Sequence, residues 1–543
     1  MRGGSLVWNA DPSPVGIMPA IVLSTLNARH SHAAFGLRYL KANLGLLEAD
    51  SEILEFDVSQ KPLDVAEAIL KRNPRILGLG VYIWNVTPTT EVVAILKRIR
   101  PDLIVILGGP EVSFETEEQE IVARADFVIT GEADLKFAEV CANLLEPAPR
   151  PLPKVIAAGL PRLEDLRLPY DLYTADDAAH RVIYVEASRG CPFTCEFCLS
   201  SLDVPVRQFP LDRFLAALQR LMDRGVLRFK FVDRTFNLHL PTSTAILRFF
   251  LERTRPGLFV HFEMVPDRLP ESLREIIARF PAGTLQFEVG IQTLNPEVEE
   301  RIRRRQDHSR MEDNLRWLRR ESGVHLHVDL IAGLPGESLE SLATGFDRTL
   351  ALAPQEIQMG ILKRLRGTPI TRHDSECGMV YSPLPPYEVL RTAQLGFEVL
   401  ARLRRFARFW DLFGNSGLFP ESLSLIWTAS NSRESPFYGF LGFSDWLHDH
   451  GVETHGISPL RRFELLWRFL TRERGRVKDE VLTTLRRDFA VACRHEMPAW
   501  LRDGVEPLTK ENRGAAAEGL PRRQQRHAVR SVEVLVGPGQ VLP

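Results

Sequence analysis

The sequence predicts an α/β protein in which two regions of alternating strands and helices are followed by a mostly helical region. Between residues 19 and 146, short apolar runs alternate with amphipathic stretches of helix length. The same alternation resumes at residue 182 and stops after about residue 370. Alternation of this kind is typical of parallel sheets covered by helices. A chain of 543 residues is too long for one core, so we expect two to four domains.

Residues 19–146 predict an open, doubly wound parallel sheet. The strands are apolar along their length, as expected where both faces of a sheet are buried. We expect five strands, which start at Ile21, Glu52, Ile76, Leu103 and Phe127. The helices that follow them are predicted at His32–Leu47, Pro62–Arg72, Thr87–Arg100, Glu117–Ala125 and Asp134–Leu145.

Two further segments flank this sheet. Residues 1–18 are predicted to be an N-terminal extension. Residues 147–181 are predicted to be a linker, because proline recurs at positions 147, 149, 151, 153, 161 and 169. Prolines at this density prevent a regular helix and favour a stiff, extended segment.

Polar residues and glycines follow the ends of the predicted strands. They are Asn27 to His32 after the first strand, Tyr82 to Asn85 after the third, Gly108 and Gly109 after the fourth, and Gly131 and Glu132 after the fifth. Ligands of open parallel sheets bind outside the carboxyl ends of the strands, so we expect a ligand site here. No Gly-x-Gly-x-x-Gly follows the first strand, which disfavours a dinucleotide.

The second alternating region opens with a loop that carries three cysteines. Residues 187–201 read ASRGCPFTCEFCLSS, with Cys191, Cys195 and Cys198 in a Cys-x-x-x-Cys-x-x-Cys pattern. Cysteines this close together in an intracellular protein are more often metal ligands than disulfide partners. Structural zinc usually takes four ligands in two separate pairs, and the sequence shows no second pair. A [4Fe–4S] cluster usually takes four thiolates, so three would leave one iron open to a substrate or cofactor.

The cysteine spacing, with Phe197 just before the last cysteine, resembles the signature of the radical S-adenosylmethionine (SAM) enzymes. The stretch TLNARHSHAAFGLRYLKANL, with GGPEV and VITGEAD, is similar to the cobalamin-binding domain that precedes many of them. The stretch RFWDLFGNSGLFPESLSLIW, with SPFYGFLGF, resembles the helical domain of unknown function in one cobalamin-linked subgroup. The chain is identified as a member of that subgroup. The resemblance implies a [4Fe–4S] cluster, SAM at its open iron, and cobalamin as cofactors.

Residues 182–370 contain six strand–helix repeats, too few for a closed eight-stranded barrel. The resemblance implies the open six-fold (β/α) barrel of the family, with its chemistry at the C-terminal ends of the strands. It assigns Cys191, Cys195 and Cys198 to the cluster, and it implies cofactor contacts at Phe197, Asp233, Asn237, Glu288, Gln292, Asp329 and Gly333. Asp233 is expected to hold the amino group of SAM. Each of these carboxylates could instead form a structural ion pair with a nearby arginine.

For cobalamin, the resemblance implies contacts at Asn27, His32, Gly108, Gly109, Gly131 and Glu132. The better-known pattern Asp-x-His-x-x-Gly is absent. Gly36 follows His32 at the wrong spacing, and no aspartate lies two residues before that histidine. We therefore predict that cobalamin is bound with no protein imidazole on cobalt.

Residues 371–503 are predicted to form a helical C-terminal domain, with helices such as Tyr387–Trp410 and Arg461–Arg472, and residues 504–543 a disordered tail. The remaining cysteines, Cys141, Cys377 and Cys493, are expected to be ordinary thiols. The basic run Arg301–Arg305 is expected to be a solvated helix face, because acidic residues lie just upstream.

The leading hypothesis is a cobalamin-dependent radical SAM enzyme that transfers a methyl group to an unactivated carbon or phosphorus centre. One alternative is radical chemistry without methyl transfer, such as a rearrangement. Another is a non-catalytic, zinc-stabilised binding module. For the enzyme, the expected partners are a small-molecule or peptide substrate and an electron donor such as flavodoxin or ferredoxin.

The composition argues against several other classes of protein. A formal net charge of −2 gives no electrostatic case for nucleic acid binding. No apolar run approaches the roughly 18 residues of a membrane span. The N-terminus has no hydrophobic signal core. We therefore expect a cytoplasmic protein that does not associate with a membrane.

Overall fold

The computed structural model describes residues 18–202, 205–428, 434–493 and 496–502. The predicted N-terminal extension, apart from Met18, and the predicted C-terminal tail lie outside these residues. The chain divides into two compact units, Met1–Ile183 and Tyr184–Pro543, which are described separately. Among the described residues, no helix is long and apolar enough to cross a membrane.

The first unit is built on a six-stranded parallel sheet in the order β2-β1-β3-β4-β5-β6. Its strands are β1 (Ile21–Asn27), β2 (Ser51–Asp57), β3 (Ile76–Gly80), β4 (Ile104–Gly108), β5 (Phe127–Thr130) and β6 (Val155–Ala157). The strand order reverses between β1 and β3. In such sheets, ligands bind at the carboxyl ends of the strands next to this reversal. The predicted doubly wound parallel sheet is confirmed.

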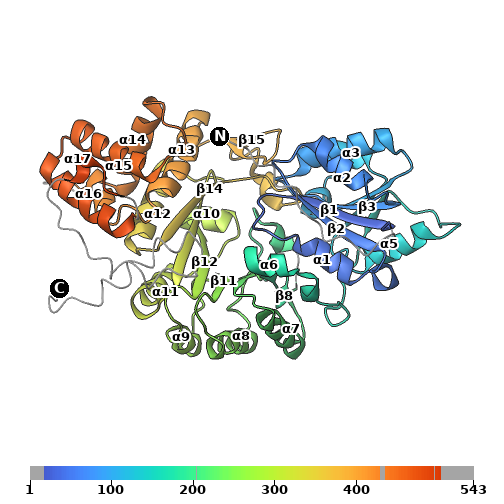
Figure 1. The fold of residues 1–543 in the computed structure, drawn as a ribbon. Helices are drawn as coiled ribbons and strands as arrows, with labels where there is room; N and C mark the ends of the chain where they lie inside the picture. The colour runs from blue at the N-terminus through green and yellow to red at the C-terminus, as the bar shows by residue number, and fades with distance from the viewer. Residues whose placement is uncertain (1–17, 203–204, 429–433, 494–495, 503–543) are drawn as a thin grey trace. The chain divides into compact units, whose positions relative to one another are not determined.

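Helices cover both faces of this sheet (Figure 1). They are α1 (Phe35–Ala42), α2 (Pro62–Leu70), α3 (Val86–Ile99), α4 (Glu120–Arg124) and α5 (Lys136–Leu145). Ile21 and Leu23 of β1 belong to a core that also contains residues of α1 and α5. Val22 and Leu26 belong to a second core, which contains residues of α2, α3 and α4. Successive strand residues point to opposite faces, so a strand between two helical layers is mainly apolar on both faces.

The segment predicted as a linker, residues 147–181, contains regular structure. Val155–Ala157 forms β6, which pairs with β5 at the edge of the sheet. Helix α6 (Ala175–His180) follows, and Thr174 forms a capping box at its start. The prolines do not prevent these elements because none lies within either of them.

The second unit contains another six-stranded parallel sheet, in the order β14-β13-β12-β11-β10-β7. Its strands are β7 (Ile183–Val185), β10 (Arg228–Phe231), β11 (Phe259–Met264), β12 (Leu285–Gln292), β13 (His325–Ala332) and β14 (Glu356–Ile361). The helices between them are α7 (Leu211–Asp223), α8 (Leu240–Glu252), α9 (Glu271–Ile277), α10 (Pro296–Arg301), α11 (His308–Glu321) and α12 (Leu339–Ala351). The outermost strands β7 and β14 do not pair with each other, so the predicted open six-fold arrangement is confirmed.

Strand β10 shows how this sheet separates an apolar face from a polar one. Phe229 and Phe231 are fully buried, with their rings near Phe250 of α8 and Phe214 of α7. Lys230 points to the opposite face, where its Nζ lies 3.3 Å from Glu288 Oε2 on β12. The alternation of side chains along a strand therefore directs apolar groups to the helices and charged groups to the barrel interior.

The C-terminal part of the second unit is mostly helical, as predicted (Figure 1). Its helices are α13 (Phe397–Phe413), α14 (Pro436–Asp449), α15 (Pro459–Arg468), α16 (Lys478–Ala492) and α17 (Ala499–Arg502). The helix predicted at Tyr387–Trp410 begins only at Phe397. Before it, β16 (Val389–Arg391) pairs with β15 (Val380–Tyr381), and Tyr387 has a φ of 52°, which interrupts a helix.

Candidate active site at the cysteine loop

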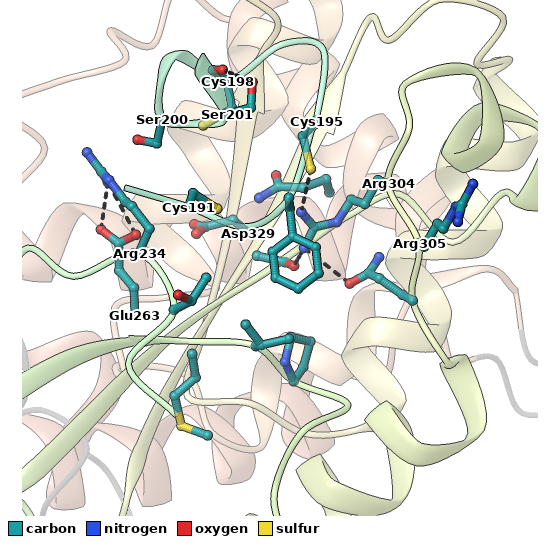
Figure 2. A pocket seen from close by; sticks show the side chains of 18 of the residues that line it. Cys191, Cys195, Cys198, Ser200, Ser201, Arg234, Glu263, Arg304, Arg305 and Asp329 are labelled. Carbon is teal, nitrogen blue, oxygen red and sulfur yellow. Dashed lines mark hydrogen bonds and ion pairs between the residues drawn. The ribbon is translucent and has the colours of Figure 1, made fainter. Parts of the chain in front are cut away.

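A cavity of about 260 Å³ lies at the C-terminal ends of the strands in the second unit. Figure 2 shows the three cysteines of the loop after β7 around this cavity. The other lining residues come mainly from the segment after β10, from β11 and the segment after it, from β12, and from the connection between α10 and α11. They include Phe193, Phe197, Arg234, Thr235, Glu263, Met264, Val265, Asp267, Glu288, Gly290, Gln292, Arg304, Arg305, Gln306 and Asp329.

The cysteine loop brings three free thiols to one wall of the cavity. Cys191 and Cys195 are buried, and Cys198 is half-buried. Burial raises the pKa of Cys191 and of Cys195, so a bound metal would have to supply the positive charge that stabilises their thiolates. Among the described residues, no three His, Cys, Asp or Glu side chains are placed to hold one metal ion. The chemistry of the donor set fits a cluster in which each thiolate binds its own iron atom.

Asp233 lies under the cysteine loop and does not line the cavity. Its two carboxylate oxygens accept the N–H of Ala187 at 3.0 and 3.2 Å and the hydroxyl of Ser188 at 2.5 Å. Burial raises the pKa of Asp233 to about 7, although these hydrogen bonds oppose the shift. Asp233 therefore fixes the backbone where the loop leaves β7.

Glu196, between the second and third cysteines, ties the loop to two other segments. Its carboxylate lies 3.0 Å from Arg303 Nε, 2.9 Å from Arg372 Nη1 and 2.6 Å from His373 Nε2. The backbone N–H of Glu196 also donates to the carbonyl of Ile302 at 3.0 Å. This anchor was not predicted. The one signal in the sequence is a charged residue inside a cysteine motif.

The basic run Arg301–Arg305 is not the solvated helix face predicted from the sequence, because two of its arginines, Arg304 and Arg305, line the cavity. Arg303 pairs with Glu196, and Arg304 Nη1 lies 3.7 Å from Cys195 Sγ. Arg305 also lines the cavity. The prediction was wrong because α10 ends at Arg301, so the later arginines lie in the connection to α11, from which Arg304 reaches Cys195.

Acidic groups line the part of the cavity next to the barrel interior. Glu288 lies 3.0 Å from His261 Nε2 and 3.3 Å from Lys230 Nζ. Burial would raise the pKa of Glu288, but the hydrogen bond with His261 and the charge of Lys230 outweigh it and hold this pKa well below its usual range. Burial raises the pKa of Asp329, against the opposing effect of His327 at 3.2 Å. The structure thus brings these two predicted carboxylates together in one cavity.

Gln292 lines the cavity at the end of β12 in an unusual backbone conformation. Its φ is 71°, and the pairing of β12 with β13 is irregular between Gly290 and Gln292. A Cβ at Gly290 would lie 2.3 Å from the Gln292 side-chain nitrogen. The glycine therefore leaves room for the Gln292 amide beside the cavity.

Two residues predicted to contact the cofactors pack against other segments of the chain. Asn237 accepts the N–H of Val265 and donates to the carbonyls of Val265 and Arg268, so it joins the segments after β10 and β11. Gly333 has a φ of 88°, and a Cβ there would lie 2.5 Å from Val389 of β16. Neither residue lines the cavity.

In the first unit, the predicted cobalamin contacts lie at the carboxyl ends of β1, β4 and β5. Asn27 Nδ2 donates to Glu55 Oε1 at 3.0 Å. His32 forms an isolated bridge with Val182. Glu132 follows Gly131, whose φ is 79°. All these positions lie on the edge of the sheet where its ligands are expected.

The neighbouring residues Gly108 and Gly109 differ in the space that each position leaves for a side chain. Gly109 has a φ of 109°, and a Cβ there would lie 2.5 Å from the carbonyl oxygen of Val81. A Cβ at Gly108 would lie 3.7 Å from its nearest neighbour, the carbonyl oxygen of Ile129. The fold therefore requires glycine at position 109 but has room for a side chain at position 108.

Three family models match the chain in the predicted order. Residues 22–141 match the B12 binding domain, residues 185–347 the radical SAM superfamily, and residues 375–528 a protein family of unknown function, DUF4080. These matches confirm a cobalamin-binding domain, a radical SAM domain and a C-terminal domain of unknown function. The cofactors of such a chain are a [4Fe–4S] cluster, SAM and cobalamin.

Individual relatives agree with these matches. An uncharacterized methyltransferase of Pyrococcus horikoshii is 27% identical over 56% of this chain and 71% of its own length. TokK of Streptomyces tokunonensis, a cobalamin-dependent radical SAM methyltransferase, is 26% identical over 55% of this chain. That match spans about half of TokK, 48% of its length.

A solved structure shares the fold. It is the radical SAM methyltransferase TsrM from Kitasatospora setae, with cobalamin and a [4Fe–4S] cluster bound. It matches with a TM-score of 0.53 at 17% identity, over 87% of this chain and 100% of TsrM.

Proposed function

Since this chain is a radical SAM protein with a B12-binding domain ahead of its barrel, we propose that it is a cobalamin-dependent methyltransferase. The observation that carries the proposal is the cavity with three free thiols at the strand ends of a barrel that follows such a domain. TokK and TsrM, which resemble this chain, are both methyltransferases by name.

The residues of the cavity have distinct roles in this proposal. Cys191, Cys195 and Cys198 would hold the cluster, and the strand ends of the first unit would hold cobalamin. When bound, the cluster with SAM supplies one-electron chemistry, and cobalamin supplies a methyl carrier. Glu288 and Asp329 offer charged acceptors that orient hydroxyl or ammonium groups of SAM or substrate.

Apolar side chains complete the site. Phe193, Phe197 and Met264 line the cavity and exclude water from it. We propose that the methyl group goes to an unactivated carbon or phosphorus centre of a small molecule or peptide. We also propose that an external one-electron donor, of the flavodoxin or ferredoxin class, reduces the cluster.

The test uses the full chain, reconstituted anaerobically with iron, sulfide and cobalamin. It is incubated with SAM that carries a deuterated methyl group and with candidate substrates, and the products are read by mass. A product that has gained the labelled methyl group supports the proposal, and Cys198→Ala, which removes a predicted cluster ligand, should not form it.

Other results support the alternatives. A converted substrate without the label would indicate radical chemistry without methyl transfer. Protein that takes up zinc but no iron or sulfide would indicate a zinc-stabilised binding module and would overturn the proposal.

A further inference from the structure

The guanidinium group of Arg304 lies against the thiol of the second cysteine. Its Nη1 donates to Cys195 Sγ at 3.7 Å, and Figure 2 shows the side chain reaching into the site from the connection after α10. Arg304 follows the cysteine motif by more than a hundred residues, so no local pattern predicts this contact.

The position of this guanidinium is fixed by its other bonds. Its Nη2 donates to the carbonyl of Gly290 at the end of β12 and to Gln306 Oε1, the latter at 3.2 Å. The backbone N–H of Arg304 donates to the carbonyl of Glu299 at 2.8 Å. A planar guanidinium held at several points keeps its remaining N–H groups in a fixed direction.

One hydrogen-bond donor of Arg304 is unsatisfied within the described residues. Its Nε is buried and makes no hydrogen bond within the described part of the chain. A buried, unsatisfied N–H is costly unless a partner binds, so a bound acceptor within reach of this Nε would be stabilising. The sulfur atoms of an iron–sulfur cluster are acceptors of this kind.

We infer that Arg304 sets the reduction potential of the cluster by donating charge-assisted hydrogen bonds to the sulfur ligands at Cys195. Reduction adds one electron from the external donor to the cluster, and no bond is broken. The added negative charge is stabilised by a nearby cation and by hydrogen bonds to sulfur, both of which raise the potential. Arg304 would therefore make the cluster easier to reduce.

This inference rests on the cluster in the proposed function and is independent of methyl transfer. It adds that a residue outside the cysteine motif controls how readily the cluster accepts an electron. Arg305 is a matched control in the same cavity wall. It carries the same charge on the next residue, but its side chain extends away from the three cysteines (Figure 2).

The test is a redox titration of the reconstituted full chain, with the reduced cluster followed by electron paramagnetic resonance. Arg304→Gln should shift the midpoint potential to a more negative value, and Arg305→Gln should shift it much less. Arg304→Lys keeps the charge but cannot bond Cys195 and Gly290 together, so its midpoint should lie between those of Arg304→Gln and the wild type.

An unchanged midpoint in Arg304→Gln would overturn the inference, as would an equal shift in Arg305→Gln, which would show only a general effect of charge. Loss of the cluster from both Arg304 variants, with the fold intact by circular dichroism, would also overturn it, because Arg304 would then retain the cluster and not tune it. If the wild type takes up no cluster, the proposed function itself fails.

Discussion

Glu196 Oε2 lies 2.6 Å from His373 Nε2, and this contact joins the cysteine loop to the 3-10 helix Pro369–His373 that follows the last barrel strand. The same carboxylate meets Arg303 and Arg372. The loop is thus held from outside by residues that arrive from two distant parts of the chain. A metal site on a loop needs such support to keep its ligands in position.

Glu196→Ala should therefore weaken both the fold and the cluster site. It leaves His373 in a buried position without its carboxylate, and we expect a loss on the order of 2 kcal/mol or more, since Arg303 and Arg372 are partly exposed. Thermal unfolding and iron content after reconstitution measure the two effects. Glu376→Gln is the control, because it removes an exposed pair with Arg301 from the same arginine run. Equal stability and iron content in the two variants would show that Glu196 is not an anchor.

Each of Cys191→Ala, Cys195→Ala and Cys198→Ala should abolish the absorbance of the cluster near about 400 nm, because each thiolate binds its own iron. The controls Cys141→Ala and Cys493→Ala change buried thiols outside the cavity and should keep the absorbance. Cys377→Ala should keep it too. Loss of the cluster in Cys377→Ala would mean that a fourth thiolate occupies the open iron, and SAM could not bind there.

Asp233→Asn tests whether this carboxylate fixes the loop or binds SAM. An amide keeps one acceptor oxygen and replaces the other by an NH2 group, so it cannot accept all three hydrogen bonds that the two carboxylate oxygens accept from Ala187 and Ser188. We expect lower iron content and a loss of about 1–3 kcal/mol in stability. Iron content and thermal unfolding are the measurements. Full iron content with at least roughly ten-fold slower SAM cleavage, about 1.4 kcal/mol, would instead support the SAM contact predicted from the sequence.

Gly108→Phe should prevent cobalamin binding while the first unit still folds. The backbone at Gly108 has space for a Cβ, so a bulky side chain there would occupy the ligand edge of the sheet and not disrupt its packing. The corrinoid spectrum after reconstitution, together with circular dichroism, checks both parts. Full cobalamin uptake by the folded variant would indicate that the corrin does not bind at the end of β4. Gly109 is unsuitable for this test, because its close approach to Val81 makes any side chain disruptive.

His30→Ala and His32→Ala should leave the spectrum of bound cobalamin almost unchanged, because we predict no protein imidazole on cobalt. His30 follows β1, and burial lowers its pKa, so the ring is neutral and able to bind metal near neutral pH. The variants are therefore a genuine test of the prediction. A spectral change on loss of either histidine would identify it as an axial ligand.

The sequence alone determined the positions of most strands, the open parallel sheets and the three cysteines. These features are local, because a strand pattern of five to eight residues, or a spacing of three and two residues between cysteines, is complete within a short window. The strand starting at Ile21 and the cysteine loop needed no distant residue to be recognised. Strand β6 was missed because Val155–Ala157 is short and lies among prolines.

Only the tertiary structure decided what surrounds the cysteines. Two contacts hold the loop, and each joins residues more than a hundred positions apart. They are Glu196 with His373 and Arg304 with Cys195. A sequence does not show whether a charged side chain faces water or contacts a thiol. That depends on whether the fold buries the side chain. For this reason the sequence predicts a solvated helix face for the arginine run, although Arg304 reaches Cys195, and it does not reveal the hydrogen bonds that Asp233 accepts from Ala187 and Ser188.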